Sequence, residues 1–209
     1  MAFIGSFPTQ PGFQSVNFKM EHPIRSTRTQ GGRTVRISTS TTLWAGTLRF
    51  PPMLLSEFLP IQGFLARVKG GLNEFDLVIP TISQSSQGYT DDATVALQPM
   101  GFTAGGQTSI TVSSALANTT ILNPGDVIRF PNHTKVYMVT NDTGVTTDSA
   151  GEAEIFFEPE LITGVAPDSG SFIQLAEVPF RMTTTNVLQE MNYRTDGLIQ
   201  YELDVGEVL

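Results

Sequence analysis

The sequence predicts a mainly β fold: a β-sandwich or split-barrel domain with one packed helix, joined to an inserted module resembling a small β-barrel. Only 15% of the 209 residues are charged, whereas Thr, Ser, Gly and Phe are frequent, which suits strands and turns better than surface helices. Short runs with two-residue alternation recur between Gly, Pro, Asn and Asp. One stretch alone has the spacing of a helix packed on a sheet.

The N-terminal quarter of the chain contains three β-compatible runs, VNFKM, RTVRISTST and TLWAGTLRF. Val35 and Ile37 lie on one side of Arg36, as in a strand with one solvated face. Because Gly31-Gly32 is a turn signal, we expect SVNFKMEHPIRSTRTQ and RTVRISTSTT to form an antiparallel pair.

After Pro51-Pro52 the sequence predicts one helix over about residues 52–69. Gly70-Gly71 provides its C-terminal stop. Pro60 implies either a kink or a regular helix that begins near Ser56. The apolar stripe expected to pack on the sheet falls at alternating spacings of four and three residues: Leu54, Phe58, Ile61, Leu65 and Val68.

Strand patterns resume after the helix with NEFDLVIP, and near Thr81 the composition becomes small, polar and Gly-rich, typical of a domain crossing or insertion. We expect the stretch from Ser83 to Asp92 to be ordered only by neighbouring molecules. Strands then return as SITVSSA, DVIRF, KVYMVT and AEIFFEP, the pattern of a small barrel or sandwich. The C-terminal runs are IQLAEVPFRM and DGLIQYELDV, and the second has an apolar side formed by Ile199, Tyr201, Leu203 and Val205.

The absence of cysteine removes disulfides, thiolate metal sites and cysteine nucleophiles, and favours assembly in a reducing cytoplasm. The N-terminal residues MAFIGSFPTQPGF lack the basic leader and long apolar run of a secretory signal. No stretch approaches the about eighteen apolar residues that a membrane span needs. We therefore expect a soluble protein with no membrane span.

The chain lacks the patterns of common catalytic sites, so we expect no enzyme activity and no cofactor. Its two histidines, His22 and His133, lie in no metal-ligand or nucleophile arrangement, and we expect His133 to be a turn residue. No GxSxG, GxGxxG or phosphate-binding GxxxxGK[ST] motif occurs. Asp91-Asp92 and residues 142–154 are rich in oxygen ligands for calcium, but their spacing departs from the EF-hand, which favours solvated turns.

Charge is distributed unevenly along the chain, whose net charge is −8. Residues 1–70 carry eight basic and two acidic side chains, a balance of +6, and the remainder has a balance of −14. In a ring of identical subunits, a positive face of one subunit can meet a negative face of the next; solvated surface at both ends is the alternative. The assembly interface is expected at the basic residues of the N-terminal hairpin: Arg25, Arg28, Arg33 and Arg36.

Nucleic acid is a disfavoured partner for this basic hairpin, because the pI is near 4.7 and no aromatic residue interleaves with the arginines. A sugar-binding role for the inserted β module is a separate hypothesis. Its candidate contacts are Tyr137 and the Phe156-Phe157 pair, for which a position in the core is the alternative. We expect Leu65→Asp to abolish folding, and charge reversal at Arg33 or Arg36 to weaken assembly of a folded monomer.

The order of these pieces resembles the N-terminal core of phage tail-tip proteins. The resemblance rests on the hairpin ending in GGRTVR, the Trp-containing strand TLWAGTLRF, PPM at the helix start, and the strand NEFDLVIP. LNPGDVIRFPNHTKVYMVTNDT, followed by GEAEIFFEPEL, looks like the β module found within a group of such proteins in tailed phages. The closing DGLIQYELDVGEVL is similar to the strand that completes their first sheet.

The resemblance implies a distal-tail-type hub or baseplate component of a bacteriophage virion, assembled in the host cytoplasm. Residues 1–80 and 174–209 would form one split domain around an inserted β module of residues 81–173. Family members form rings, commonly of six subunits, beneath the tail tube, dock other hub, baseplate and fibre proteins, and have no catalytic residues. A carbohydrate-binding receptor-recognition module of the tail, and a minor tail or head–tail completion protein, remain as alternatives.

Overall fold

Strands dominate the computed structural model of this chain, so the predicted mainly β fold class is confirmed. The chain divides into two compact units: unit 1 comprises Met1–Leu77 and Arg181–Val208, and unit 2 comprises Val78–Phe180 with Leu209. The sequence placed these crossings near residues 81 and 174. The structure describes residues 1–38, 41–167, 171–186, 192–193 and 197–209.

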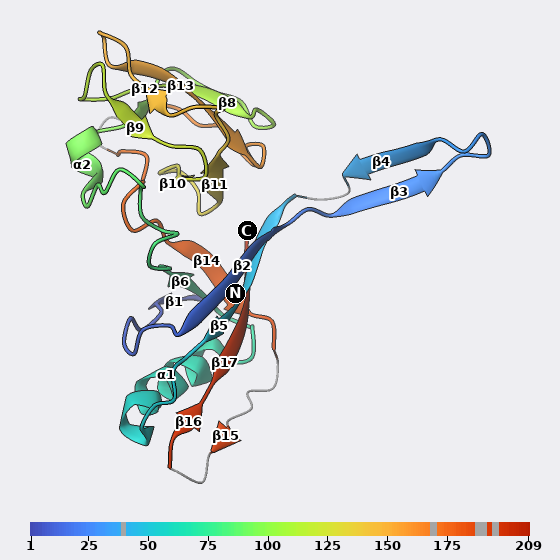
Figure 1. The fold of residues 1–209 in the computed structure, drawn as a ribbon, viewed down its shortest axis with the longest axis vertical. Helices are drawn as coiled ribbons and strands as arrows, with labels where there is room; N and C mark the ends of the chain where they lie inside the picture. The colour runs from blue at the N-terminus through green and yellow to red at the C-terminus, as the bar shows by residue number, and fades with distance from the viewer. Residues whose placement is uncertain (39–40, 168–170, 187–191, 194–196) are drawn as a thin grey trace. The chain divides into compact units, whose positions relative to one another are not determined.

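Unit 1 is built on a six-stranded sheet (Figure 1), whose strands in spatial order are β1 (Phe3–Ser6), β6 (Glu74–Leu77), β14 (Phe180–Thr184), β17 (Glu202–Glu207), β5 (Leu43–Arg49) and β2 (Ser15–Glu21). β1 runs parallel to β6, whereas β17 is antiparallel to both β14 and β5, and β2 is antiparallel to β5. Two short strands, β15 (Asn192–Tyr193) and β16 (Ile199–Gln200), form a separate ribbon. The predicted apolar side of the last run is confirmed, since Ile199, Tyr201, Leu203 and Val205 are all buried.

Helix α1 (Leu55–Val68) packs on this sheet through the predicted stripe of Phe58, Ile61, Leu65 and Val68, all buried. The centroid of the Phe58 ring lies 5.3 Å from that of Tyr201, the residue directly before β17. The assignment of Leu54 to the stripe is wrong. This residue is the helix N-cap, and its extended backbone directs the side chain away from the stripe, leaving it 56% exposed. The carboxylate of Glu57 instead accepts the N–H of Leu54 at 2.8 Å, satisfying an otherwise free donor at the helix start.

The N-terminal runs form one long hairpin made of two successive strand pairs (Figure 1). The predicted antiparallel pairing about Gly31-Gly32 holds only next to the turn, where β3 (Ile24–Arg28) pairs with β4 (Thr34–Ser38). β2 pairs with β5 instead, with Met20 opposite Trp44, and this register differs by two residues from that of the β3–β4 pair, in which Ile24 lies opposite Ser38. Residues 39 and 40 of the predicted RTVRISTST strand lie outside the described residues.

Unit 2 contains a five-stranded antiparallel sheet, whose strands in spatial order are β10 (Val127–Arg129), β11 (Val136–Val139), β13 (Glu152–Glu158), β8 (Ser109–Ser113) and β7 (Gln98–Pro99). The four main strands match the predicted runs DVIRF, KVYMVT, AEIFFEP and SITVSSA. A second pair joins β9 (Thr120–Leu122) to β12 (Val145–Thr146), and a short helix, α2, spans Asp92–Val95. The predicted strand IQLAEVPFRM is regular only from Phe180, because Gln174 makes just an isolated bridge to Arg129.

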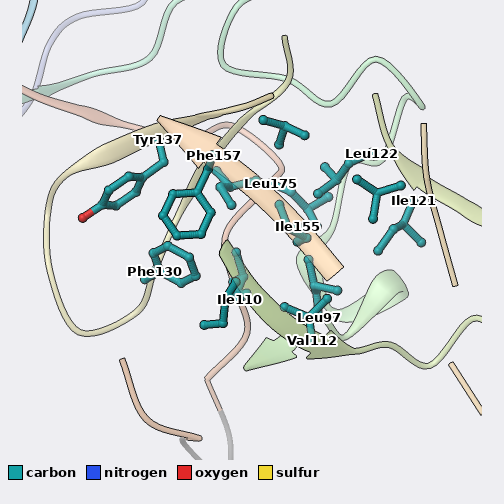
Figure 2. Close-up of a cluster of buried hydrophobic side chains, with 14 of the residues drawn as sticks. Leu97, Ile110, Val112, Ile121, Leu122, Phe130, Tyr137, Ile155, Phe157 and Leu175 are labelled. Carbon is teal, nitrogen blue, oxygen red and sulfur yellow. The ribbon is translucent and has the colours of Figure 1, made fainter. Parts of the chain in front are cut away.

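Figure 2 shows the core of unit 2, where side chains from facing strands meet. The rings of Phe130, Tyr137 and Phe157 lie 5.3 to 5.6 Å apart, in edge-on arrangements favourable for aromatic pairs. Ile110 and Ile155, opposite each other on β8 and β13, extend the same core and are buried. Unit 2 therefore has a core of its own.

The polar stretch from Ser83 to Asp92 was expected to depend on neighbours for order, and this is wrong. Ser83 Oγ accepts the N–H of Ile79 at 2.8 Å, and the Ser86 N–H and hydroxyl both donate to the Asp126 carboxylate at 3.0 Å. Ser83 is fully buried. Hydrogen bonds within unit 2 hold the polar residues of this stretch in place. Composition alone does not reveal such bonds.

Candidate assembly surface

The end of the long hairpin, residues 24–38, extends beyond the β2–β5 pair in Figure 1 and is called the arm below. It consists of β3, the turn and β4, and every residue of both strands is exposed. A two-stranded hairpin without packing on a further element is marginally stable in water. Contact with another molecule would therefore stabilise the arm by covering one of its exposed faces.

Strand register gives the arm two different faces. Residues directly opposite in an antiparallel pair share a face, and successive residues alternate between faces. One face, called the arginine face, carries Ile24, Ser26 and Arg28 of β3 opposite Ser38, Arg36 and Thr34 of β4. The other, called the apolar face, carries Arg25 and Thr27 opposite Ile37 and Val35.

The four arginines predicted to form the assembly interface all lie on the arm, but on different sides of it. Arg28 and Arg36 belong to the arginine face, Arg25 to the apolar face, and Arg33 to the turn. Arg28 Nε donates to the Gly32 carbonyl at 3.4 Å. Within the described residues, none of the four forms an ion pair with a carboxylate. Residues 22–38 contain no acidic residue, so the arm is a concentrated positive surface.

Apolar side chains on the arm were missed by the sequence interpretation, which gave the Val35 and Ile37 side of the strand to the interior. In the structure Ile24 is 60% exposed, Ile37 63% and Val35 41%. The two-residue alternation correctly placed Val35 and Ile37 on one face. It could not show that none of the described elements of unit 1 covers that face.

A second exposed face with charge of the opposite sign lies on the outer side of the unit 2 sheet. Along β13, Ile155 and Phe157 point into the core, whereas Glu152, Glu154, Phe156 and Glu158 are exposed. Phe156 is 45% exposed. Cross-strand neighbours on β8 are small and polar, with Thr111 opposite Glu154. We call this row, Glu152, Glu154, Phe156 and Glu158, the acidic face.

The proposed sugar contacts are only partly available. Tyr137 and Phe157 are fully buried in the core of unit 2, which corrects their assignment as binding residues. Each lies at an inward position of its strand, and the two rings pack against each other at 5.3 Å. Phe156 alone of the three candidates is exposed.

His133 lies in the turn between β10 and β11, as predicted, and is fastened there by hydrogen bonds. Its Nε2 lies 2.7 Å from Tyr137 Oη, which also accepts the N–H of Ile162 at 3.3 Å. Its Nδ1 lies 2.9 Å from Asn132 Oδ1. Burial, reinforced by the positive charge of Arg129, lowers the pKa of His133 to about 4. These contacts fit a neutral ring carrying its hydrogen on Nδ1 and holding the turn in place.

Three of the acidic residues considered as calcium ligands, Asp91, Asp92 and Asp148, accept hydrogen bonds from backbone N–H groups. Asp91 Oδ1 caps α2 by accepting the N–H of Ala93 at 2.9 Å, and Asp92 Oδ1 accepts the N–H groups of Leu175 and Ala176 at 2.8 Å. Asp148 closes a turn by accepting two further backbone N–H groups at 2.8 Å. Among the described residues there is no group of three or more His, Cys, Asp or Glu side chains placed to hold a metal ion.

His22 directly follows β2, and its Nδ1 lies 3.1 Å from the hydroxyl of Thr42.

Across the part of the chain that the structure describes, no helix has the length and apolar character needed to cross a membrane. Comparison of the sequence with protein-family models gives no match, and comparison with curated proteins gives none either.

Proposed function

We propose that this protein is a structural component of a bacteriophage tail, a distal-tail or baseplate hub protein that forms a ring below the tail tube and docks other tail-tip or fibre proteins. The observation that carries the proposal is the arm, a basic hairpin with exposed apolar side chains that no described element of its own unit covers. The resemblance of GGRTVR, TLWAGTLRF and NEFDLVIP to tail-tip proteins supplies the phage context.

The arm suits a ring because it makes each subunit asymmetric. A closed ring repeats one heterologous contact, in which a surface of each subunit meets a different surface of the next. An extended hairpin provides one such surface, and its positive charge favours an acidic receiving surface. The expectation of six subunits rests on the family resemblance.

The carbohydrate-binding alternative is weakened, because two of its three candidate aromatic contacts, Tyr137 and Phe157, belong to the core. Aromatic platforms for sugars must be open to solvent, and only Phe156 of this set is.

The proposal is tested by measuring the mass and shape of the purified chain, by light scattering and negative-stain imaging, with and without tail-tube and hub proteins from the same genome. We expect a ring, either from the chain alone or after those partners are added. A chain that stays monomeric under both conditions would contradict the proposal.

A matched control removes the arm without disturbing the rest of unit 1. Replacing residues 22–42 with Asn-Gly joins β2 to β5 through a two-residue hairpin turn directly after their last pair, Glu21 opposite Leu43. We expect this variant to keep the near-ultraviolet spectrum of the folded protein while losing ring formation. Rings that form equally well without the arm would show that assembly uses another surface.

A further inference from the structure

We propose that the arginine face of the arm docks on the acidic face of unit 2 in a second copy of this chain. The inference rests on the proposed function, because it assumes self-association, and it adds the surface that receives the arm. Its basis is a match between two rows of exposed side chains: Ile24, Arg36 and Arg28 on the arm, and Phe156, Glu154 and Glu152 on β13.

Spacing along the two strands is the first part of the match. Ile24 lies two residues from Ser26, which pairs with Arg36, and Arg28 lies two residues further on. Along the axis of the arm, an apolar position is thus followed by an arginine on β4 and then an arginine on β3, at steps of about 6.7 Å, the rise of two strand residues. On β13, Phe156 is followed by Glu154 and Glu152 at the same two-residue steps. With Ile24 set against Phe156, Arg36 meets Glu154 and Arg28 meets Glu152.

Charge is the second part of the match. Strand β13 carries Glu152, Glu154 and Glu158 on its outer face, and neither β13 nor the neighbouring β8 contains a basic residue. The arm has four arginines and no acidic residue. Opposite potentials on two surfaces steer their encounter and fix the register in which they dock. Arginine is well suited to this role because its planar group can bind a carboxylate through two hydrogen bonds.

Exposed apolar surface is the third part. Ile24 is 60% exposed and lies diagonally next to Arg36, and Phe156 is 45% exposed and lies between Glu154 and Glu158. Contact between Ile24 and Phe156 would remove apolar area from water, which adds binding affinity. Solvent-exposed ion pairs alone contribute little affinity. On the β8 side of the acidic face the cross-strand neighbours are small and polar, with Ser109 directly opposite Phe156, and they leave room for a ribbon to approach.

The first test uses disulfide trapping, which is clean because the chain has no cysteine of its own. Ser26→Cys places a thiol on the arginine face level with Arg36, and Thr111→Cys places one on β8 level with Glu154. These two variants are mixed under the conditions in which the wild-type chain associates and are then oxidised. We expect a disulfide-linked dimer containing one chain of each variant. A non-reducing gel separates this dimer, and mass spectrometry of its band identifies the two chains.

The matched control is Thr27→Cys, one residue along the same strand but on the apolar face. Mixed with Thr111→Cys, it should give no more mixed dimer than random collision produces. Equal trapping from Ser26→Cys and Thr27→Cys would overturn the proposed docking face. Trapping only within a chain that carries both Ser26→Cys and Thr111→Cys, and none between chains, would overturn the assignment to a second copy.

The second test exchanges the charges. Arg28→Glu with Arg36→Glu, and separately Glu152→Arg with Glu154→Arg, should each weaken association at least about tenfold, because like charges would then face each other. A mixture of the two variants should regain the wild-type mass, since each reversed arm then meets a reversed face. Failure of the mixture to recover would count against the pairing. If the wild-type chain never associates, the proposed function itself fails; if it associates but the β13 variant does too, only the docking surface is wrong.

Discussion

The two ends of the long hairpin differ in what lies against them. At the β2–β5 end, Trp44 and Leu48 are buried, and the Phe18 ring stacks on Trp44 at 5.3 Å. At the β3–β4 end, Ile24 and Ile37 remain more than half exposed. Both ends have regular antiparallel register and two-residue alternation. The alternation of residue types along the strands is therefore the same at both ends. The two ends differ in whether a further layer of the fold buries one face of the strand pair.

Charges show the same contrast. At the β2–β5 end, Lys19 pairs with Glu21 at 2.7 Å and Arg49 with Glu202 at 2.9 Å. On the arm, among the described residues, no carboxylate pairs with an arginine. A surface on which opposite charges pair locally attracts a charged partner only weakly. Unpaired charge of one sign favours binding to a surface of the other sign.

Introducing a carboxylate at each end of the hairpin should produce the largest difference. Leu48→Asp places an unpaired charge where exposure is 0%, and we expect it to cost more than about 4 kcal/mol of unfolding free energy, enough to unfold unit 1. Ile37→Asp should change that free energy by no more than about 0.5 kcal/mol. Urea unfolding followed by fluorescence of Trp44, the single tryptophan, measures both. An unfolded Ile37→Asp variant would mean that the arm is packed in the free subunit.

Adding one methyl group at each end should give a smaller difference. A Cβ at Gly46 would lie 2.6 Å from the Phe18 ring and 2.7 Å from the Asn17 carbonyl oxygen, so Gly46→Ala must move both and should cost about 1–3 kcal/mol. Gly31, in the turn of the arm, has open space around the same position, so Gly31→Ala should leave stability unchanged. The same Trp44 fluorescence assay compares them; equal effects would contradict the packing contrast.

Periodicity carried most of the fold prediction, because alternation and helical spacing depend on local geometry. The stripe from Phe58 to Val68 and the alternation from Ile199 to Val205 are examples in which one face is covered by a neighbouring layer. Leu54 was misplaced because the spacing continues for one residue beyond the helix start. The hydrogen bonds that fix Ser83 and Ser86 were not predictable, since their partners lie elsewhere in the fold.

The candidate surface was only half predictable. Arg25, Arg28, Arg33 and Arg36 stood out as a local excess of charge, which is visible in the sequence. The assignment of Arg25, Arg28 and Arg36 to two different faces needs the register of β3 with β4. The exposure of Ile37 depends on which surfaces the fold leaves uncovered. The acidic row on β13 had a sequence signal in the alternation EAEIFFE, but its outward side could be assigned only once Ile155 and Phe157 were seen in the core.

A packed ionisable group should respond to pH where the arm does not. The pKa of His133 is lowered from 6.5 to about 4, mainly by burial, so unfolding lets the ring take up a proton between these values. The contribution of His133 to the unfolding free energy of unit 2 is therefore complete above pH 6.5 and falls as pH drops towards 4. The partial exposure of the ring reduces the expected loss to about 1–2 kcal/mol. Hydrogen exchange of β11 amides at pH 7 and pH 5 measures it.

The matched variant for this experiment is His133→Gln, which removes the titrating group but keeps a side chain that can hydrogen-bond the Tyr137 hydroxyl. Carboxylates elsewhere contribute to the pH dependence of both proteins, so the difference between wild type and variant isolates the imidazole. An identical pH dependence in the two proteins would show that His133 does not titrate differently on folding.

The smallest effect concerns the local stability of the arm itself. In the free subunit its amide groups are held by one strand pair without a packed face, so we expect opening to cost no more than about 1 kcal/mol and hydrogen exchange there to be fast. Amides shared by β2 and β5 should exchange only with unfolding of unit 1. On assembly the arm amides should become protected while those of β2–β5 stay unchanged, because docking supplies the missing layer. Arm amides that already exchange slowly in the monomer would mean that the hairpin is stable without a partner, which would contradict the proposed role of the arm in assembly.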